Sequence, residues 1–583
     1  MRLVLILQIA VTAAVFAQAY IYRNSFFQED AIAYLDMARS LMKGDWLNIV
    51  DAIWSPLYPV LISVWLSLFN PSPEIEPQVV MACNFSIFLG QLIAFEWFRR
   101  QFMRFRLWAL PEDGSFAPLD DRYATIILYF AFAFSVTVLS GVFQQTPDWI
   151  ANSFLYASLA VFLKIVEKPD RSLNFVLLGV FIGLGYLAKS VYVAYTFLFF
   201  LFCLLALRQE KSRWKHLSTY LLTVALLSAP HVIALSFKLG KPSMMETGKL
   251  SIQETVMGKP GHHRIEPGLK HGERILFADP LTYAFPDFPD STYAVWRHRA
   301  YYAQGTRLEI DLGRWLRVTG MNVLIYFFYF GIVLLIALAA ASLLARRKLF
   351  TSSALKAFWP LHGFSILALA MIAPMTNLTF DGNVRYFAPL VVVATAALIG
   401  SLRLLKDDKR SKLASFTLVT FLPAYFSLFI FSMIKTQTFL LSRPDPPVSV
   451  RIARGLHELG LKNGDCVAQL GFLPGTMRIY EDLLPLSASS NYFWAYLGRL
   501  RIVADIPHEK RFFEVSEETR RELISRLKSV GARALVIYPG HRPPASHRQE
   551  WTRVPGSECY VLLFPQLPLD GKKQSIEGEN NDR

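Results

Sequence analysis

Residues 26–40 read FFQEDAIAYLDMARS, and they follow shortly after an apolar stretch at residues 2–21. A second landmark, WSPLYP, comes at residues 54–59. The apolar stretch is long enough to cross a bilayer, so the acidic pair at residues 29 and 30 is expected at the membrane–water interface. Carboxylates placed there, beside a segment rich in proline and aromatic residues, favour chemistry at the membrane surface over a purely membrane-spanning role.

The composition predicts a polytopic α-helical membrane protein. The chain has 583 residues, of which 53% are hydrophobic and 18% charged, and its mean hydropathy is +0.33. Soluble domains carry roughly 25% charged residues. About eleven stretches approach or exceed the ~18 apolar residues that span a bilayer. They are residues 2–21, 78–98, 122–142, 148–166, 172–188, 190–207, 216–237, 319–345, 355–374, 386–405 and 413–434.

The formal net charge is +15. On a soluble protein this excess would suggest nucleic acid as a partner. Here the basic residues flank the apolar spans, as the positive-inside rule predicts, and nucleic acid is not expected. With a cytoplasmic N-terminus, five basic segments all fall on the cytoplasmic side of the plasma (inner) membrane. They lie near residues 99–106, 164–171, 208–215, 346–348 and 403–412.

The same orientation places three long regions outside: residues 22–77, 238–318 and 435–583. Within the first, residues 29–43 are predicted to be a helix along the interface, and residues 56–69 a second interfacial or re-entrant helix. Residues 1–434 then form the membrane domain, which includes the outer loops 22–77 and 238–318. Residues 435–565 are predicted to be an extracytoplasmic α/β domain from their helix and strand patterns, and residues 566–583 a disordered tail. Whether Cys466 and Cys559 pair is left open.

Three segments carry a family resemblance. The first holds Asp30, Tyr34, Ala38-Arg39, GDW at 44–46 and SPLYP at 55–59; the others are GLGYLAK at 183–189 and RYFAPL at 385–390. In this order they resemble GT-C fold glycosyltransferases, in the protein O-mannosyltransferase-like branch that includes the lipid A aminoarabinose transferases. The resemblance covers residues 1–434. It implies transfer of a sugar from a polyprenyl-phosphate donor to a hydroxyl acceptor on a glycan, lipid or protein, at the outer face of the membrane.

The resemblance also implies inversion at the anomeric carbon, with Asp30 as general base. A positioned base contributes roughly 10²–10⁴-fold in rate. The alternative is a solvated loop acid or a helix N-cap. Glu29 is a second candidate, because the family often carries Asp-Glu where this chain has Glu-Asp. Ala31 stands where the family has a further acid, so no cofactor is certain and a divalent metal is left as an option.

Other residues are assigned by the same resemblance. Asp148 would orient the acceptor or share the role of base; otherwise it is an acid stabilised by the dipole of its helix. Lys189 and Arg385 would hold the lipid phosphate; otherwise the lysine snorkels to the interface and the arginine is an interface anchor. Tyr34 and Tyr58 would line a substrate groove, although aromatic residues are common at membrane interfaces in any case.

Two other functions are compatible with the sequence. One is a transporter or flippase for a lipid-linked or small solute, and the other is a catalytically inactive envelope scaffold. Transporters often contain internal repeats, which are not evident here, and the ionisable residues gather at one face of the predicted bundle. No Gly-rich phosphate loop, zinc-ligand spacing or nucleophile elbow occurs in the sequence. The pattern therefore favours chemistry at the interface.

Overall fold

The computed structural model divides into two compact units. The helical unit lies within residues 1–264, 295–447 and 474–493, and the sheet unit within residues 265–294, 448–473 and 494–583. The residues that the structure describes are 2–24, 30–108, 116–253, 274–285, 288–297, 309–322, 324, 367, 383–401, 404–405, 409–440, 448–471, 492–537 and 541–564.

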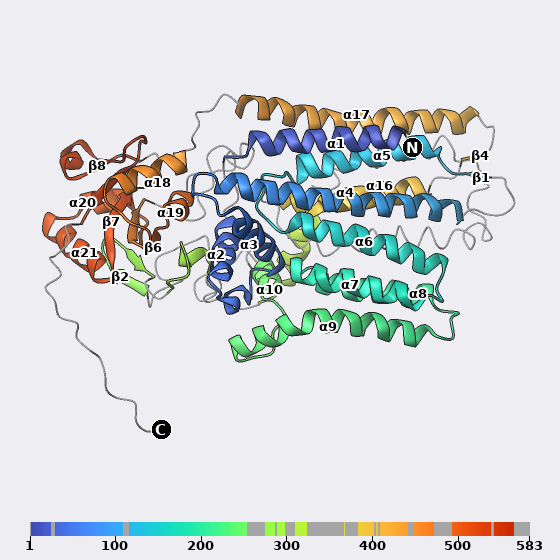
Figure 1. The fold of residues 1–583 in the computed structure, drawn as a ribbon, viewed down its shortest axis with the longest axis horizontal. Helices are drawn as coiled ribbons and strands as arrows, with labels where there is room; N and C mark the ends of the chain where they lie inside the picture. Colours follow the sequence, from blue (N-terminus) through green and yellow to red (C-terminus); the bar gives the residue numbers. More distant parts are fainter. Residues whose placement is uncertain are drawn as a thin grey trace, which may run out of the picture. The chain divides into compact units, whose positions relative to one another are not determined.

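Long helices run side by side in the helical unit (Figure 1). Among the described residues, five helical stretches are long and apolar enough to cross a membrane: α1, α4, α6, α9, and α5 with its π-helical continuation to Leu139. This confirms a multi-pass membrane protein. The predicted count of about eleven spans stays a prediction, because residues 325–366 lie outside the described residues. The long helices are α1 (Arg2–Ile21), α4 (Glu76–Trp108), α5 (Asp121–Phe134), α6 (Asp148–Glu167), α7 (Ser172–Ala188), α8 (Tyr192–Ala206), α9 (Arg213–Leu239), α16 (Ala388–Ser401) and α17 (Lys409–Leu440). Strands β1 (Phe116–Ala117) and β4 (Leu404–Leu405) pair with each other.

Small residues let α7 and α9 approach closely. A Cβ atom on Gly179 would lie 2.6 Å from the Cβ of Thr223, and one on Gly183 would lie 2.8 Å from the Cβ of Leu227. Two glycines four residues apart on one helix face are typical of close helix packing in membranes, where van der Waals contact drives association. Helix α7 ends at Ala188, the residue before Lys189.

Short helices gather at one end of the long ones (Figure 1). Those labelled in the figure are α2 (Asp30–Met42), α3 (Leu57–Phe69) and α10 (Thr247–Ser251). Further short helices are η1 (Trp46–Ile49), α11 (Ala294–Arg297) and η6 (Asn383–Phe387). The sequence predicts that residues 29–43 form a helix along the interface, and the place of this helix relative to the membrane stays a prediction. Ten of the 13 residues of α2 are buried, because α3 and other segments pack over it. The helix that begins with Asp30 is therefore enclosed by protein.

The sheet unit is α/β, with strand order β2-β3-β6-β5-β7-β9-β8. The central strand β5 is parallel to both β6 and β7, and antiparallel strands flank them. The predicted helix at 448–459 and the strands near 465–470, 534–538 and 560–564 are all present. The elements are β2 (Ile275–Phe277), β3 (Thr282–Ala284), α18 (Val448–Glu458), β5 (Cys466–Leu470), α19 (Phe493–Leu497), β6 (Arg501–Ile506), α20 (Glu509–Glu514), α21 (Glu517–Ser529), β7 (Ala532–Ile537), η8 (Ala545–Glu550), β8 (Thr552–Arg553) and β9 (Tyr560–Leu563).

Two strands of this sheet come from the middle of the chain. The sequence assigned residues 238–318 wholly to an outer loop of the membrane domain, yet β2 and β3 lie in that region and β3 pairs with β6. A strand of three residues is too short to show the alternating pattern that marks strands in a sequence. The cysteines left open by the sequence are both free thiols. Cys466 accepts a hydrogen bond from Arg501, 2.9 Å away.

A carboxylic acid is buried in the middle of the sheet. Asp505 on β6 is fully buried, and its strand neighbours are Tyr283 and Gln469. Tyr293 donates a hydrogen bond to one carboxyl oxygen, while the other has no hydrogen-bond partner among the described residues. Burial raises the pKa of Asp505 to about 7. The folded sheet unit therefore holds a proton up to near neutral pH.

The stability of the sheet unit is expected to fall as the pH rises from about 5 to 7. In this range folded Asp505 keeps its proton while the unfolded residue has lost it, so each pH unit favours unfolding by up to about 1.4 kcal/mol. Asp505→Asn should remove this dependence. The measurement is alkylation of the buried thiol of Cys559 in the full chain in detergent, read by peptide mass spectrometry. The alkylation rate of Cys559 is compared between the wild-type protein and Asp505→Asn at each pH, so that the titration of the thiol itself cancels. A ratio of the two rates that does not change with pH would contradict the expectation.

Candidate functional site

Four residues singled out from the sequence meet at one end of the helical unit. Asp30 begins α2, Asp148 begins α6, Lys189 follows α7, and Arg385 lies in η6 before α16. The Nη2 atom of Arg385 donates to Oδ2 of Asp30 at 3.0 Å, across 355 residues of sequence. Its Nε atom is 3.6 Å from Oδ2 of Asp148, and Lys189 forms an ion pair with Oδ1 of Asp148. The four side chains therefore form one cluster, called the charge cluster below.

Local structure holds Asp148 and Lys189 together. Asp148 is in the first turn of α6, where a carboxylate is stabilised by the helix dipole. Oγ1 of Thr146 also donates to its Oδ2 at 2.6 Å. Lys189 has an extended backbone (φ −159°, ψ 133°) because α7 ends at Ala188. This break between α7 and α8 lets the ammonium group reach Asp148.

The members of the charge cluster differ in exposure. The side chains of Arg385 and Asp148 are 7% and 4% exposed, whereas those of Asp30 and Lys189 are 21% and 22% exposed. Asp30 is thus the carboxylate that a second molecule can reach. Nη1 of Arg385 is buried with no hydrogen-bond partner among the described residues. Since buried N–H groups are normally bonded, Arg385 has capacity to bind a further oxygen acceptor.

Tyr386 lies beside the charge cluster. The Nζ atom of Lys189 lies 3.7 Å from the centroid of its ring, and the guanidinium carbon of Arg385 lies 5.2 Å from it. A cation over an aromatic face is attracted by the negative face of the ring. Tyr386 stands in the RYFAPL segment, but sequence reasoning singled out only Arg385 there. In the sequence, a tyrosine that contacts cations in a site cannot be told from one that anchors a helix at the membrane interface.

The two predicted groove tyrosines lie in the packed interior. The ring of Tyr34 contacts those of Trp54 and Tyr58, with centroids 5.3 and 5.4 Å away. Tyr58 is fully buried, and its hydroxyl donates to Oδ1 of Asn84 at 2.7 Å. Burial and then the nearby charge of Asp30 raise the pKa of Tyr34 well above its usual value. Tyr34 therefore stays protonated beside the charge cluster.

A substrate-binding role for Tyr34 and Tyr58 stays a prediction. Glu29, the second candidate base, lies outside the described residues. Among the residues that the structure describes, no group of three or more His, Cys, Asp or Glu side chains is placed to hold a metal ion. The option of a divalent metal stays a prediction as well.

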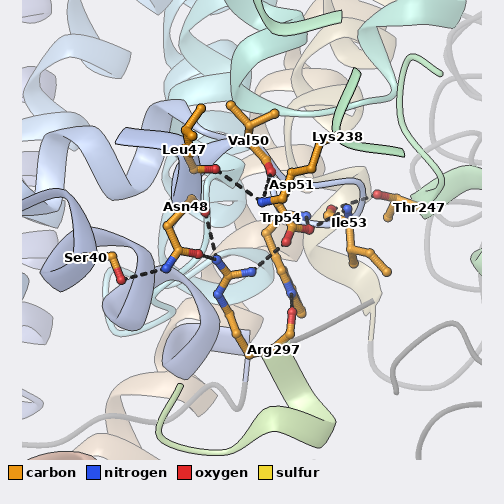
Figure 2. A network of polar contacts seen from close by, with 10 residues as sticks. All are labelled: Ser40, Leu47, Asn48, Val50, Asp51, Ile53, Trp54, Lys238, Thr247 and Arg297. Carbon is orange, nitrogen blue, oxygen red and sulfur yellow. Dashed lines mark hydrogen bonds and ion pairs between the residues drawn. The ribbon is translucent and has the colours of Figure 1, made fainter. Parts of the chain in front are cut away.

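A buried arginine joins the two long loops of the helical unit (Figure 2). Arg297, at the end of α11, is 1% exposed, and its Nη1 donates to Oδ2 of Asp51 at 2.6 Å. Its Nη2 donates to the backbone oxygen and Oδ1 of Asn48, at 2.8 and 2.5 Å. Nδ2 of Asn48 donates in turn to Oγ of Ser40, near the end of α2, at 2.9 Å. Arg297, Asp51 and Asn48 are called the loop clasp below.

Further hydrogen bonds hold the segment at residues 47–54 (Figure 2). Oδ1 of Asp51 accepts the backbone N–H groups of Ile53 and Trp54, at 2.8 and 3.0 Å. Lys238 from α9 donates to two backbone oxygens, those of Leu47 and Val50, at 3.2 and 2.8 Å. The loop clasp thus holds one end of α2, and Asp30 lies at the other end. Sequence reasoning did not find it.

A family model matches part of the chain. Residues 118–233 match the model described as dolichyl-phosphate-mannose-protein mannosyltransferase. This segment runs from just before α5 into α9 and contains Asp148 and Lys189. The match confirms the resemblance predicted from the sequence motifs. Among curated proteins, none matches the chain.

Solved structures with similar folds include bacterial and archaeal proteins. ArnT from Cupriavidus metallidurans in the apo state is 12% identical with a TM-score of 0.40, and the match covers 96% of this chain and 99% of that chain. Its structure bound to undecaprenyl phosphate is 13% identical with a TM-score of 0.39, at the same coverage of 96% and 99%. The archaeal oligosaccharyltransferase AglB from Archaeoglobus fulgidus, in complex with an inhibitory peptide and a dolichol-phosphate, is 13% identical with a TM-score of 0.42, covering 91% and 69%. The assignment of a function therefore rests on the family model and on the geometry of the site.

Proposed function

We propose that this chain is a membrane glycosyltransferase of the GT-C type, which moves a sugar from a polyprenyl-phosphate donor to a hydroxyl group of a glycan, lipid or protein. The observation that carries the proposal is the charge cluster: the accessible carboxylate of Asp30 lies 3.0 Å from Nη2 of the buried Arg385. Nη1 of the same arginine has no hydrogen-bond partner among the described residues. Transfer from a phosphate needs both a base and a fixed cation. The family model supports the same chemistry over residues 118–233.

In this proposal each member of the charge cluster has one task. Asp30 accepts the proton of the acceptor hydroxyl as its oxygen attacks the anomeric carbon from the face opposite the phosphate. The bond from the anomeric carbon to the phosphate oxygen breaks, and its electron pair leaves with the polyprenyl phosphate, so the anomeric centre inverts. Arg385 and Lys189 stabilise the charge that grows on the leaving phosphate, an interaction stronger in the transition state than in the ground state. Asp148 holds both cations in place.

The proposal places the charge cluster on the outer side of the plasma (inner) membrane. The segments 164–171 and 208–215 are rich in Lys and Arg. Residues 164–171 connect the end of α6 to the start of α7, and residues 208–215 connect the end of α8 to the start of α9. The charge cluster lies at the opposite ends of these helices, because α6 begins at Asp148 and α7 ends beside Lys189. Basic segments favour the cytoplasmic side. The same rule gives a cytoplasmic N-terminus.

The test is transfer of radiolabelled sugar from a panel of polyprenyl-phosphate sugars by the purified full chain in detergent, with membrane extract as acceptor. Transfer from at least one donor is expected. A folded protein that transfers no sugar but moves lipid-linked solute across vesicles would favour the transporter. A protein that does neither, yet retains partners in a pull-down, would favour the scaffold.

Arg385→Gln is expected to weaken binding of polyprenyl phosphate about 10- to 100-fold, because charged hydrogen bonds contribute roughly 1.5–3 kcal/mol. The measurement is displacement of a fluorescent polyprenyl phosphate from the protein in detergent. Arg100→Gln is the matched control. The side chain of Arg100 is 68% exposed, and it lies near the C-terminal end of α4, away from the charge cluster. Equal effects of the two substitutions would contradict the assignment of Arg385 to the phosphate.

A further inference from the structure

An aromatic surface lies on the side of the helical unit formed by α4, α6 and α7. These helices lie side by side (Figure 1), and each contributes one half-buried ring, Trp97, Phe154 and Phe181. The ring of Phe181 contacts those of Trp97 and Phe154, with centroids 5.7 and 6.4 Å away. Ile93, one turn before Trp97, is 71% exposed. The surface is therefore open on one side, and in a multi-pass membrane protein that side faces lipid chains.

Cationic side chains lie at the end of this surface that is farther from the charge cluster. Nζ of Lys164, in the last turn of α6, lies 5.1 Å from the ring centroid of Trp97. Arg104 is exposed on α4, two turns beyond Trp97 on the same helix face, and Lys168 is exposed directly after α6. All three cations lie within electrostatic range of the carboxylate of Glu167. Arg104, Lys164 and Lys168 are called the basic rim below.

The basic rim carries an excess of positive charge. Within the part of the chain that the structure describes, no ion pair joins any of its three cations to a carboxylate. Glu167 is the acid near all of them, and it accepts a hydrogen bond from Gln101 at 2.9 Å, which links the ends of α4 and α6. The next charges along the chain, those of Asp170 and Arg171, cancel. Three cations therefore face one carboxylate, and an added anion would balance them.

A phospholipid with a negative head group fits both parts. Its phosphate would contact the basic rim, and one acyl chain would lie on the aromatic surface. Phe154 precedes Lys164 by ten residues on α6, which is about 15 Å along the helix. This is half of the ~30 Å hydrocarbon core of a bilayer, the depth of one leaflet. A soluble phosphate would use the basic rim alone, and a neutral lipid would use the rings alone.

We infer that the basic rim and the aromatic surface form a binding site for an anionic phospholipid, in the leaflet opposite to the charge cluster. Basic groups between membrane helices commonly bind the head groups of such lipids. The inference does not depend on the proposed function, because it uses only the multi-pass character of the chain. The positive-inside rule by itself requires basic residues at this end of the helices, but it requires no cation over a ring and no aromatic surface beneath it.

The experiment is native mass spectrometry of the full chain in detergent, titrated with phosphatidylglycerol or with phosphatidylcholine of the same acyl chains. The wild-type protein is expected to bind phosphatidylglycerol at least about tenfold more tightly. Lys164→Gln should weaken phosphatidylglycerol about fivefold, the contribution of one basic residue near a lipid surface, and leave phosphatidylcholine within about twofold. Lys164→Arg keeps the charge and should retain the preference, which covers the case in which glutamine disturbs folding. Trp97→Ala should weaken both lipids, because it removes part of the surface for the chain.

Lys215→Gln is the matched control. Lys215 is exposed in the first turn of α9, in the other basic segment at this end of the helices, and its loss should change the affinity for phosphatidylglycerol less than twofold. Equal effects of Lys164→Gln and Lys215→Gln would overturn the inference, because general surface charge would then suffice. Equal affinities of the wild-type protein for the two lipids would overturn it as well. So would displacement of phosphatidylglycerol by an equal concentration of glycerol phosphate, which would show a site for a soluble phosphate.

Discussion

Asp30→Asn is expected to lower kcat by about 10²–10⁴-fold while the KM for the lipid donor changes little. Asparagine has the size of aspartate, and its side-chain oxygen can still accept the hydrogen bond from Arg385. The guanidinium group therefore stays in place for the phosphate. What is lost is the ability to take up a proton, which is needed only as the acceptor attacks. A change in kcat without a change in donor binding is the signature of such a group.

The measurement is the initial rate of sugar transfer as a function of donor concentration, with polyprenyl phosphate binding followed in parallel. Asp45→Asn is the matched control, since Asp45 is an exposed acid in the same loop whose side chain makes no cap hydrogen bond. Its rate should stay within about twofold of wild type, as exposed substitutions usually have small effects. If Asp30→Asn keeps most of its activity and Asp148→Asn loses it with donor binding intact, the base is Asp148.

The sequence was sufficient to predict the members of the charge cluster, though not their contacts. The family resemblance singled out Asp148, Lys189 and Arg385, and each of them stands at the end of an apolar span, where an ionisable residue is conspicuous. Placing the spans in the membrane brings these ends to one side. The structure adds that Arg385 bridges both carboxylates. That bridge depends on how α2, α6 and η6 pack, which a hydrophobicity pattern does not contain.

Contacts between loops could not be predicted for physical reasons. The sequence singled out Tyr34 and Tyr58 but gave no sign that their rings contact each other inside the protein. Arg297 and Asp51 lie 246 residues apart in two polar loops with many charges. No periodicity selects one pair among them, since loop contacts follow from tertiary packing and not from a repeat. The loop clasp became visible only in the structure.

Breaking the loop clasp is expected to destabilise the loop around residues 46–54 by about 3–5 kcal/mol, the usual cost of removing one partner of a buried ion pair. The side chains of Arg297 and Asp51 are only 1% and 8% exposed. Asp51→Asn is the cleaner variant, because asparagine can still accept the N–H groups of Ile53 and Trp54 through its oxygen. It removes the charge and leaves Arg297 buried without a counter-ion. Arg297→Gln removes the other partner.

The measurement is hydrogen exchange of peptides from residues 30–54 in the full chain, with the double variant included. If the pair acts as a unit, the double variant should be less destabilised than the sum of the single ones, by about 0.5–3 kcal/mol. The ion pair between Arg511 and Asp279 is the matched control, because its side chains are 50% and 56% exposed. Arg511→Gln should have little effect on stability, as exposed pairs contribute little.

The loop clasp should also affect transfer through α2. Asn48 links Arg297 to Ser40 near the end of this helix, and Asp30 lies at its start. Loosening the clasp should therefore misplace the base more than the phosphate site, since Lys189 and Arg385 belong to other segments. A misplacement of about 1 Å lowers rates by about 10²-fold. We thus expect Asp51→Asn to lower kcat with little change in polyprenyl phosphate binding. Equal loss of both, without faster exchange in residues 30–54, would show that the clasp does not act through α2.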